Sequence, residues 1–175
     1  MRRPPRPPRP RLPRRLRSPL ATLAVLTPAL LGAALGPGGS GETIPLSGNE
    51  PGRHLDVTLT RVVDPADPAP PGSDSDSDPD RLVAVQLRLE NTGTAAYKDS
   101  PAKASHLLDS DGQRFTGSNT TTTAGPAFPD TVTLAPGDSA LGFVTFRLPN
   151  DAGLAAVQFA LNAGLADDVG HWSLS

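Results

Sequence analysis

Cysteine is absent from all 175 residues of the chain. Its absence excludes disulfide bonds, a thiolate nucleophile and any metal site built from cysteine ligands. It also removes the residue to which a lipid could be attached after an export signal. A folded domain in this chain must therefore be held together by a hydrophobic core, and enough residues follow the N-terminal segments to build one.

Acidic residues are absent from the first 36 positions, which carry eight of the 16 basic residues, all of them arginine. The remainder carries eight Lys and Arg against 18 Asp and Glu, a net charge of −10. A basic leader on an acidic body is typical of a targeting segment. Because the acidic body repels phosphate groups, we expect no nucleic-acid partner.

No apolar run has the usual length of a membrane-spanning helix. The longest covers residues 20–35 and is interrupted by Pro28, whereas a span needs about 18 to 20 apolar residues. Residues 1–36 instead match a signal peptide, with an Arg/Pro-rich start, this apolar centre and small residues behind it. We expect cleavage to leave a mature N-terminus between residues 35 and 41 on a secreted, extracellular protein. The alternative is an uncleaved segment that tethers the protein to the cytoplasmic membrane.

The arginines of the leader allow two further interpretations. The pair Arg14-Arg15 could belong to a twin-arginine export signal, although no Phe-Leu-Lys follows it. Residues 1–17 could also lie upstream of the true translation start.

Long helical patterns are missing as well, and the body alternates with a period of two. Residues 37–52 are rich in Gly, Pro and Ser and are predicted to be a flexible linker. Over residues 53–175, short alternating apolar and polar runs lie between turn residues, which is typical of half-buried antiparallel strands. Residues 141–148 are apolar on both faces, as in a central strand, and residues 152–156 could form one helical turn. The inward positions of the alternating runs are Leu55, Val57, Leu59 and Val63; Val83, Val85, Leu87 and Leu89; Val132 and Leu134; and Val157, Phe159 and Leu161.

Turn residues separate these runs. Asn91-Thr92-Gly93 ends one strand, and Asp111-Gly112 predicts a two-residue hairpin. Pro136-Gly137 suits a type II turn, because proline fixes φ and glycine allows a positive φ. Pro149 closes a further strand by removing a hydrogen-bond donor. The resulting strands, about seven in number, predict an all-β, immunoglobulin-like antiparallel β-sandwich.

The predicted core is centred on the most regular strands. Phe146 has apolar neighbours two residues away on both sides, so its ring should lie in the middle of the layer. Trp172, near the end of the chain, is predicted to be buried in the core rather than to face a ligand. The full predicted core is Val85, Leu87, Val144, Phe146, Val157, Phe159 and Trp172.

Residues 64–80 form a loop of Pro, Asp and Ser with no apolar side chain larger than proline. Such a segment cannot bury itself, so it is predicted to be disordered and dispensable. The loop contains the weak candidates for cation binding in the chain, since its aspartates alternate as Ca²⁺ ligands sometimes do. It lacks the central Gly and distal Glu of an EF-hand, which favours a solvated loop without a metal. These aspartates are Asp74, Asp76, Asp78 and Asp80.

The other polar side chains suggest no site. Asp109 and Asp111 fit hairpin turn chemistry better than a cation loop. His54, His106 and His171 lie far apart, and a zinc site would have to be assembled across strands.

Catalytic motifs are equally lacking. No Gly-x-Ser-x-Gly nucleophile motif occurs. The adjacent carboxylates Asp167 and Asp168 would point to opposite faces of a strand and are better placed in a surface loop. We therefore expect no catalytic residue and no cofactor.

The motifs, taken in order, resemble a known family. They are the Asn-x-Gly strand end, the Asp-x-Asp-Gly hairpin, Leu134-x-Pro136-Gly137, Gly142-x-x-x-Phe146 and the final Trp172. They are similar to a bacterial extracellular domain of unknown function, called telokin-like for its immunoglobulin-like sandwich and related to the mycobacterial immunoprotective extracellular protein. The resemblance covers residues 53–175. It implies secreted proteins or lipoproteins of Gram-positive bacteria, from whose lipoprotein members this chain departs by lacking cysteine, and it supplies no catalytic residues.

These observations predict a secreted or cell-surface module that binds a protein or cell-envelope partner and catalyses no reaction. Sandwiches of this kind recognise partners through loops or exposed strand edges. One alternative is a sandwich-based hydrolase or metal-dependent enzyme, which would bring His106 or His171 together with Asp side chains in a pocket. Another is a structural domain associated with the cell wall, which would present a long exposed edge.

Overall fold

The structure is a computed structural model that describes residues 41–69 and 80–174. The leader predicted over residues 1–36 lies outside the described residues. Ten strands and two four-residue helices are formed by the described residues. The helices are α1 (Pro101–Ala104) and α2 (Leu161–Gly164). The strands are β1 (Thr43–Ser47), β2 (His54–Val63), β3 (Asp80–Asn91), β4 (Tyr97–Asp99), β5 (Ser105–Asp109), β6 (Arg114–Thr116), β7 (Val132–Leu134), β8 (Ser139–Pro149), β9 (Leu154–Ala160) and β10 (Val169–Ser173).

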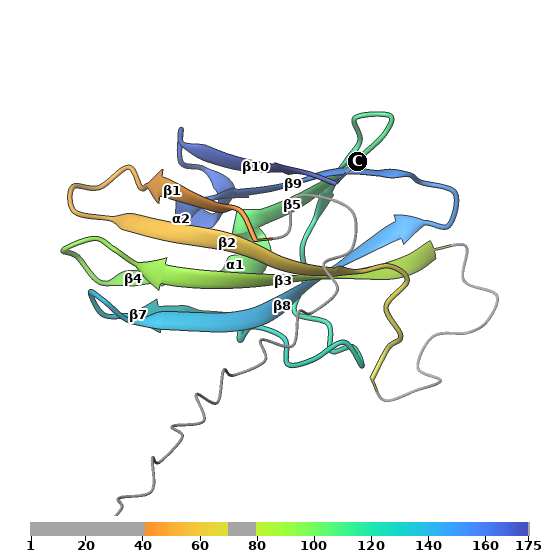
Figure 1. The fold of residues 1–175 in the computed structure, drawn as a ribbon, viewed down its shortest axis with the longest axis horizontal. Coiled ribbons are helices and arrows are strands. Elements are labelled where there is room, and N and C mark those ends of the chain that lie inside the picture. Colours follow the sequence, from red (N-terminus) through yellow and green to blue (C-terminus); the bar gives the residue numbers. More distant parts are fainter. Residues whose placement is uncertain (1–40, 70–79, 175) are drawn as a thin grey trace, which may run out of the picture. The chain divides into compact units, whose positions relative to one another are not determined.

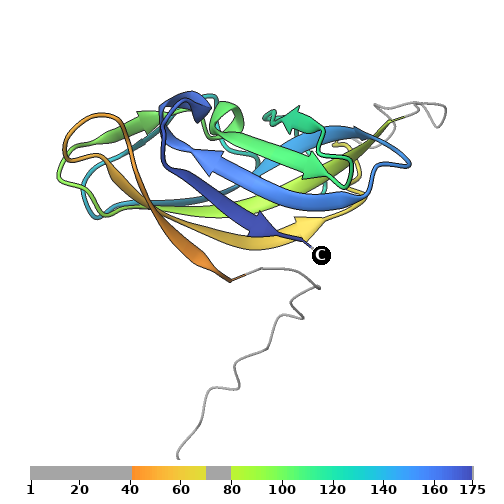
Figure 2. The ribbon, with the colours of Figure 1, turned by 90° about the horizontal axis from the view of Figure 1, so that it is seen from above.

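Two four-stranded antiparallel sheets make up the sandwich (Figures 1 and 2). One has the order β1-β2-β3-β8, the other has the order β10-β9-β5-β6, and β4 and β7 form a separate short pair. The all-β sandwich predicted from the sequence is confirmed. The predicted number of about seven strands is lower than the ten that the described residues form. β1 lies in the segment predicted to be a linker, and β4, with three residues, showed no recognisable alternation.

β1 corrects the prediction that residues 37–52 are a flexible linker. Residues 43–47 pair with β2 from Thr43 opposite Thr58 to Ser47 opposite His54. Leu46 is buried, and Ile44 packs against the same core. The Gly/Pro-rich composition around these few residues concealed a two-position alternation that becomes visible only when β2 lies beside it.

A β-bulge in β2 changes which valine faces the core. The register with β3 shifts between Leu59 and Arg61, so one extra residue enters the strand and the alternation changes phase. Val62 packs against the main core, whereas Val63, the predicted inward residue, packs against a second cluster.

The second cluster explains why β8 is apolar on both faces. β8 is not the central strand predicted over residues 141–148 but the last strand of its sheet. Its outer face is buried because loops cover it, and Phe143 packs there with Leu82, Ala84 and Ala66. A face covered by loops requires the same apolar residues as a face covered by a sheet.

The start of the loop predicted over residues 64–80 is held in place rather than disordered. The Ala66 N–H donates to the Leu82 carbonyl at 2.7 Å, and the Ala69 N–H donates to the Thr121 carbonyl at 3.0 Å. Both bonds fix residues 64–69 against the sheet and the neighbouring loop. The sequence prediction missed this because alanine and proline can pack on a sheet face without forming an apolar run.

All seven predicted core residues are buried between the sheets. Phe146 and Trp172 are among the largest side chains that are completely enclosed. The Trp172 indole N–H donates to the Glu42 carbonyl at 3.0 Å, which satisfies its polar atom at the border of the core. The predicted core is therefore confirmed.

The turns follow their sequence signals with one change. Asp138 N–H donates to the Ala135 carbonyl at 3.0 Å around Pro136-Gly137, and Gly137 has the positive φ of 87° that a type II turn requires. The β5–β6 hairpin has three loop residues instead of two, because Asp109 N–H donates to the Gln113 carbonyl at 3.1 Å. Gly112 adopts a φ of 79°, as the last position of a three-residue hairpin loop does.

The helical turn proposed for residues 152–156 is not formed, since β9 begins at Leu154. Leu154 and Ala156 pair with β5, with a register shift between them, and Ala156 also pairs with β10. Pairing with two strands outweighs the weak helical preference of a short alanine-rich stretch.

Asn91 joins the end of β3 to its surroundings. Its amide nitrogen donates to the carbonyls of Ala95 at 3.0 Å and Leu134 at 2.9 Å. Its amide oxygen accepts the N–H of Gly93 at 3.0 Å. A Cβ on Gly93 would lie 2.2 Å from the Gly52 carbonyl oxygen. The Asn-x-Gly signature thus holds the end of β3 in close contact with the segments around Gly52 and Leu134, where there is no room for a side chain at position 93.

Candidate interaction surface

Of the four predicted cation ligands, the structure describes Asp80 alone. Asp74, Asp76 and Asp78 lie outside the described residues. Asp80 is the first residue of β3 and pairs with Pro149 of β8. A solvated loop without a bound cation, with these aspartates as weak candidate ligands, stays the prediction.

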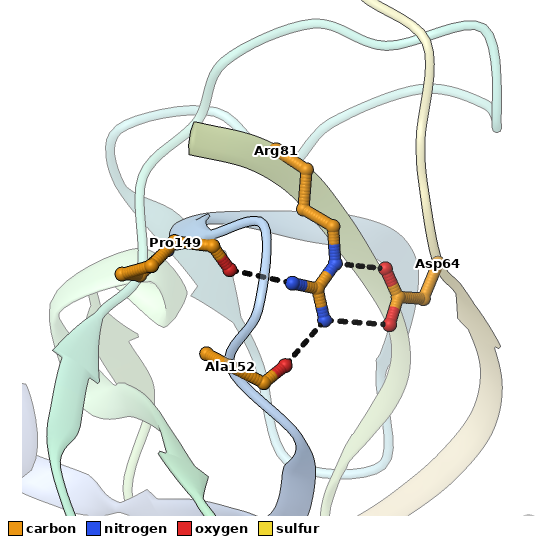
Figure 3. A network of polar contacts seen from close by, with 4 residues as sticks. All are labelled: Asp64, Arg81, Pro149 and Ala152. Carbon is orange, nitrogen blue, oxygen red and sulfur yellow. Dashed lines mark hydrogen bonds and ion pairs between the residues drawn. The ribbon is translucent and has the colours of Figure 1, made fainter. Parts of the chain in front are cut away.

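Arg81 organises the polar contacts next to Asp80 (Figure 3). Its guanidinium binds the Asp64 carboxylate through Nε at 2.7 Å and Nη2 at 3.1 Å. It also donates to the carbonyls of Pro149 at 2.6 Å and Ala152 at 2.7 Å. The hydrogen bond to Asp64 raises the pKa of Arg81 above its usual value, although partial burial opposes this. Arg81 therefore ties together the end of β2, β3 and the β8–β9 turn, which is a structural role.

The other aspartate and histidine candidates are also dispersed. The Asp109 carboxylate accepts the backbone N–H groups of Asp111 at 3.0 Å and Gln113 at 2.7 Å, so it serves the hairpin turn. His54, His106 and His171 lie on β2, β5 and β10. Among the described residues, no three His, Asp or Glu side chains gather as metal ligands would.

His106 lies beside Arg114 rather than beside an acid. Its Nδ1 is 2.9 Å from an Arg114 guanidinium nitrogen, so Nδ1 accepts that hydrogen bond. Burial, together with the charge of Arg114, lowers the pKa of His106 below its usual value. Tyr97, the other amphipathic aromatic, is buried at the start of β4, and burial raises the pKa of its hydroxyl.

A strained turn connects β9 to β10, and the sequence analysis did not find it. Asn162 and Ala163 have φ values of 59° and 55°, which are left-handed conformations unfavourable for non-glycine residues. The Ala163 N–H donates to the Asp99 carboxylate at 2.9 Å, and Asn162 Oδ1 accepts the Asn49 N–H at 3.2 Å. The turn exposes 78% of Leu165 at its tip.

Among the described residues, three outer strands of the two large sheets are protected against pairing with a further strand, and we call such an edge blunted. The first of them is β1. Along an antiparallel strand, successive residues point their backbone N–H and C=O groups alternately toward and away from the neighbouring strand. Gly48 N–H donates to the Arg53 carbonyl at 2.9 Å, so the backbone groups of Thr43, Pro45 and Ser47 point away from β2. Pro45 has no N–H, and the Ser47 N–H is taken by the Asp168 carboxylate at 2.8 Å. Proline and a capped donor are established means of blocking edge pairing.

The outer edges of β8 and β6 are blunted by other means. The Ser118 and Thr145 backbones exchange hydrogen bonds of 2.7 and 2.9 Å, and Phe128 N–H donates to the Phe143 carbonyl at 3.0 Å. A loop therefore pairs with β8 where a further strand would lie. β6 has three residues and carries the exposed cation Arg114, and short, charged edges also resist pairing.

β10 is the remaining edge of the two four-stranded sheets, and among the described residues no strand pairs with its outer side. It is the outermost strand of its sheet and lies above β9 in Figure 1. Leu174 N–H donates to the Ala155 carbonyl at 2.8 Å, so the alternation turns the backbone groups of Val169, His171 and Ser173 away from β9. Nothing in the described chain hydrogen-bonds to these outward groups. We call this row the β10 edge.

Comparison with known proteins places the chain in a family. A family described as Domain of unknown function (DUF4352) matches residues 52–167. The chain belongs to this family. The DUF4352 match spans β2 to β9 and ends before β10. The resemblance inferred from the sequence motifs is thereby confirmed. No curated protein matches the chain.

Three solved structures are similar to this chain to different degrees. MPT63, a secreted protein from Mycobacterium tuberculosis, aligns with a TM-score of 0.54 and 13% identity over 81% of this chain and 98% of its own. The YjhA protein from Bacillus subtilis gives 0.45 and 15% identity over 69% and 78%. A functionally unknown protein from Listeria monocytogenes gives 0.45 and 14% identity over 79% and 85%. The likeness to MPT63 supports the immunoglobulin-like sandwich.

No helix among the described residues has both the length and the apolar character needed to cross a membrane.

Proposed function

We propose that this protein is an extracellular, non-enzymatic interaction module that binds an extended segment of a partner protein along the β10 edge. The open edge is the observation that carries the proposal, since the three other outer edges of the two four-stranded sheets are blunted. Adding a strand to an open edge is an established recognition mode, in which the backbone gives affinity and alternate side chains give specificity.

Two further observations support the proposal. The leader has the three parts of an export signal, and MPT63, whose fold is similar, is a secreted protein. An unpaired edge promotes aggregation. In the described part of the chain, three of the four edges of the large sheets are protected against such aggregation, whereas the β10 edge is not. An unprotected edge that risks aggregation is expected to be kept for a function, such as binding a partner.

The test is a proline at the centre of the edge. His171→Pro removes one outward N–H and places a ring where a docking strand would lie. It breaks no backbone hydrogen bond to β9, because the His171 backbone groups face away from that strand. The side-chain contact of His171 Nδ1 with Gln158 Nε2, at 3.4 Å, is lost in this variant and in its control alike. His171→Thr is the matched control, since it changes the same exposed side chain and keeps the N–H. Thermal unfolding of both variants checks that the sandwich remains intact.

Extended peptides selected for binding to the exported protein provide the probe. We expect them to protect the amides of Val169, His171 and Ser173 from hydrogen exchange. His171→Pro should lose at least tenfold in affinity, and His171→Thr should change it by less than threefold. Peptides that bind His171→Pro as tightly as the parent protein would refute the proposal.

A further inference from the structure

The charges around the β10 edge indicate what kind of segment can dock there, provided that the proposed function holds. The edge offers three residues with outward N–H and C=O groups. Val169 to Ser173 covers about 13 Å at the usual rise of a strand. A docking segment of about five residues can therefore satisfy the whole row.

The middle of the edge is uncharged. β10 has the sequence Val-Gly-His-Trp-Ser and contains no Asp, Glu, Lys or Arg. Val169 is 46% exposed, so an apolar side chain on the docking segment would bury it. A charged side chain at the centre of the segment would lose water there without gaining an ion pair.

Both ends of the edge are acidic. Asp167 and Asp168 precede Val169 and are exposed, and Asp168 already accepts the Ser47 N–H. At the other end, Glu42 is exposed, and its backbone carbonyl lies 3.0 Å from Trp172 Nε1. Neither Asp167 nor Glu42 forms an ion pair within the described residues.

A second copy of the chain does not fit these charges. In an antiparallel pair of β10 edges, Val169 of one copy lies opposite Ser173 of the other. Asp167 of each copy would then approach the end that carries Glu42 of its partner. Carboxylates would face carboxylates at both ends, between bodies that are themselves acidic.

We propose that the β10 edge binds a protein segment of about five extended, uncharged residues with a basic residue at each end. The flanking cations would pair with Asp167 at one end and Glu42 at the other. The acidic body would add a longer-range attraction that accelerates the encounter and weakens with salt.

Synthetic peptides of alternating valine and threonine test this directly. The first peptide carries a lysine at each end, the second a glutamate at each end, and the third a serine at each end. We expect the lysine peptide to bind the exported protein about five- to tenfold more tightly than the serine peptide at low salt, as two exposed ion pairs would give. The glutamate peptide should bind least, and 0.5 M salt should remove most of the difference.

Variants identify the groups responsible. Asp167→Lys should remove the ion pair with one of the two lysines. The ratio of the affinities for the lysine and serine peptides should therefore fall about threefold. Asp111→Lys is the matched control, because it makes the same charge change in the distant β5–β6 hairpin. Equal effects of the two variants would mean that only net charge matters and would overturn the inference.

The two proposals fail in different ways. If His171→Pro abolishes binding of all three peptides but the flanking charges make no difference, the edge binds strands and this inference is wrong. If His171→Pro changes nothing, the proposed function is wrong as well. A dimer in sedimentation experiments that His171→Pro dissociates would identify a second copy as the occupant and would also refute this inference.

Discussion

Phe146 shows at the scale of one residue how the core holds the sandwich. Its ring is completely buried, and the same strand contributes Val144 and Leu148 to the same layer. Truncating a buried phenylalanine removes its transfer free energy and leaves a cavity, at a cost of about 3 to 5 kcal/mol. A domain of this size has about 5 to 15 kcal/mol in total. Phe146→Ala should therefore be marginally stable or unfolded in a denaturant titration.

Phe115→Ala is the control for Phe146→Ala, because Phe115 lies on the short edge strand β6 and is only partly buried. It should cost clearly less. A loss below about 1 kcal/mol for Phe146→Ala would mean that the ring faces solvent, with β8 shifted by one residue.

Asn91 is a buried polar side chain on which the stability of the fold also depends. Asn91→Ala removes the side-chain donor to the Ala95 and Leu134 carbonyls. The Gly93 N–H loses Asn91 Oδ1 and keeps its bond to the His54 carbonyl at 3.1 Å. Each buried group left unsatisfied is costly, and we expect a loss of about 2 to 4 kcal/mol in the free energy of unfolding. Thr92→Ala, at the exposed neighbour, should change it by less than about 0.5 kcal/mol. Equal effects of the two substitutions would mean that the buried hydrogen bonds of Asn91 do not stabilise the fold.

The α2 turn shows at the scale of an element that local strain is maintained by tertiary contacts. Ala163 occupies a left-handed conformation that costs an L-residue about 1 to 2 kcal/mol. Ala163→Gly should relieve that strain, partly offset by the greater entropy of glycine in the unfolded chain. We expect a stabilisation of up to about 1 kcal/mol, measured by urea unfolding.

Ala155→Gly tests whether that gain belongs to the left-handed turn. Ala155 lies in β9 beside a register shift against β5, and its carbonyl accepts the Leu174 N–H at 2.8 Å. Glycine in this strand should destabilise by about 0.5 to 1 kcal/mol. If both substitutions destabilise to the same degree, the left-handed turn is not populated in solution.

Arg81 joins three elements, so its loss should affect stability more than that of an ordinary surface arginine. Arg81→Met breaks the bidentate pair with Asp64 and the two bonds to backbone carbonyls. We expect a loss of about 1 to 3 kcal/mol in the free energy of unfolding. Arg88→Met breaks an exposed pair with Glu90 and should cost at most about 0.5 kcal/mol. A cost for Arg81→Met no larger than for Arg88→Met would contradict the structural role.

At the scale of the whole molecule, the start of the folded domain limits where the leader can be removed. Gly41 N–H donates to the Leu59 carbonyl at 2.6 Å, and the Glu42 carbonyl binds Trp172. Cleavage downstream of Gly41 would remove contacts that close the sandwich. Mass spectrometry of the exported protein should therefore find an N-terminus between residues 35 and 41. An intact Met1 on membrane-bound protein would support the uncleaved anchor instead.

The sequence by itself determined the features that depend on neighbouring residues. Alternation identified the inward residues of β3 and β9, because side chains on a strand point to opposite faces in turn. Pro136-Gly137 determined its turn through backbone preferences alone. Trp172 and Phe146 were identified as core because large apolar side chains in regular strands gain most from burial.

Only the tertiary structure decided the features that depend on segments distant in sequence. β1 becomes a strand because β2 lies beside it, and Phe143 is buried because a loop covers its face. The left-handed turn at Asn162 is held by Asp99 and Asn49, which no local pattern connects to it. The sequence predicted that Trp172, near the end of the chain, is buried, but an edge is open or blunted according to what lies next to it. The candidate site could therefore be recognised only after the four edges of the two large sheets were placed in space.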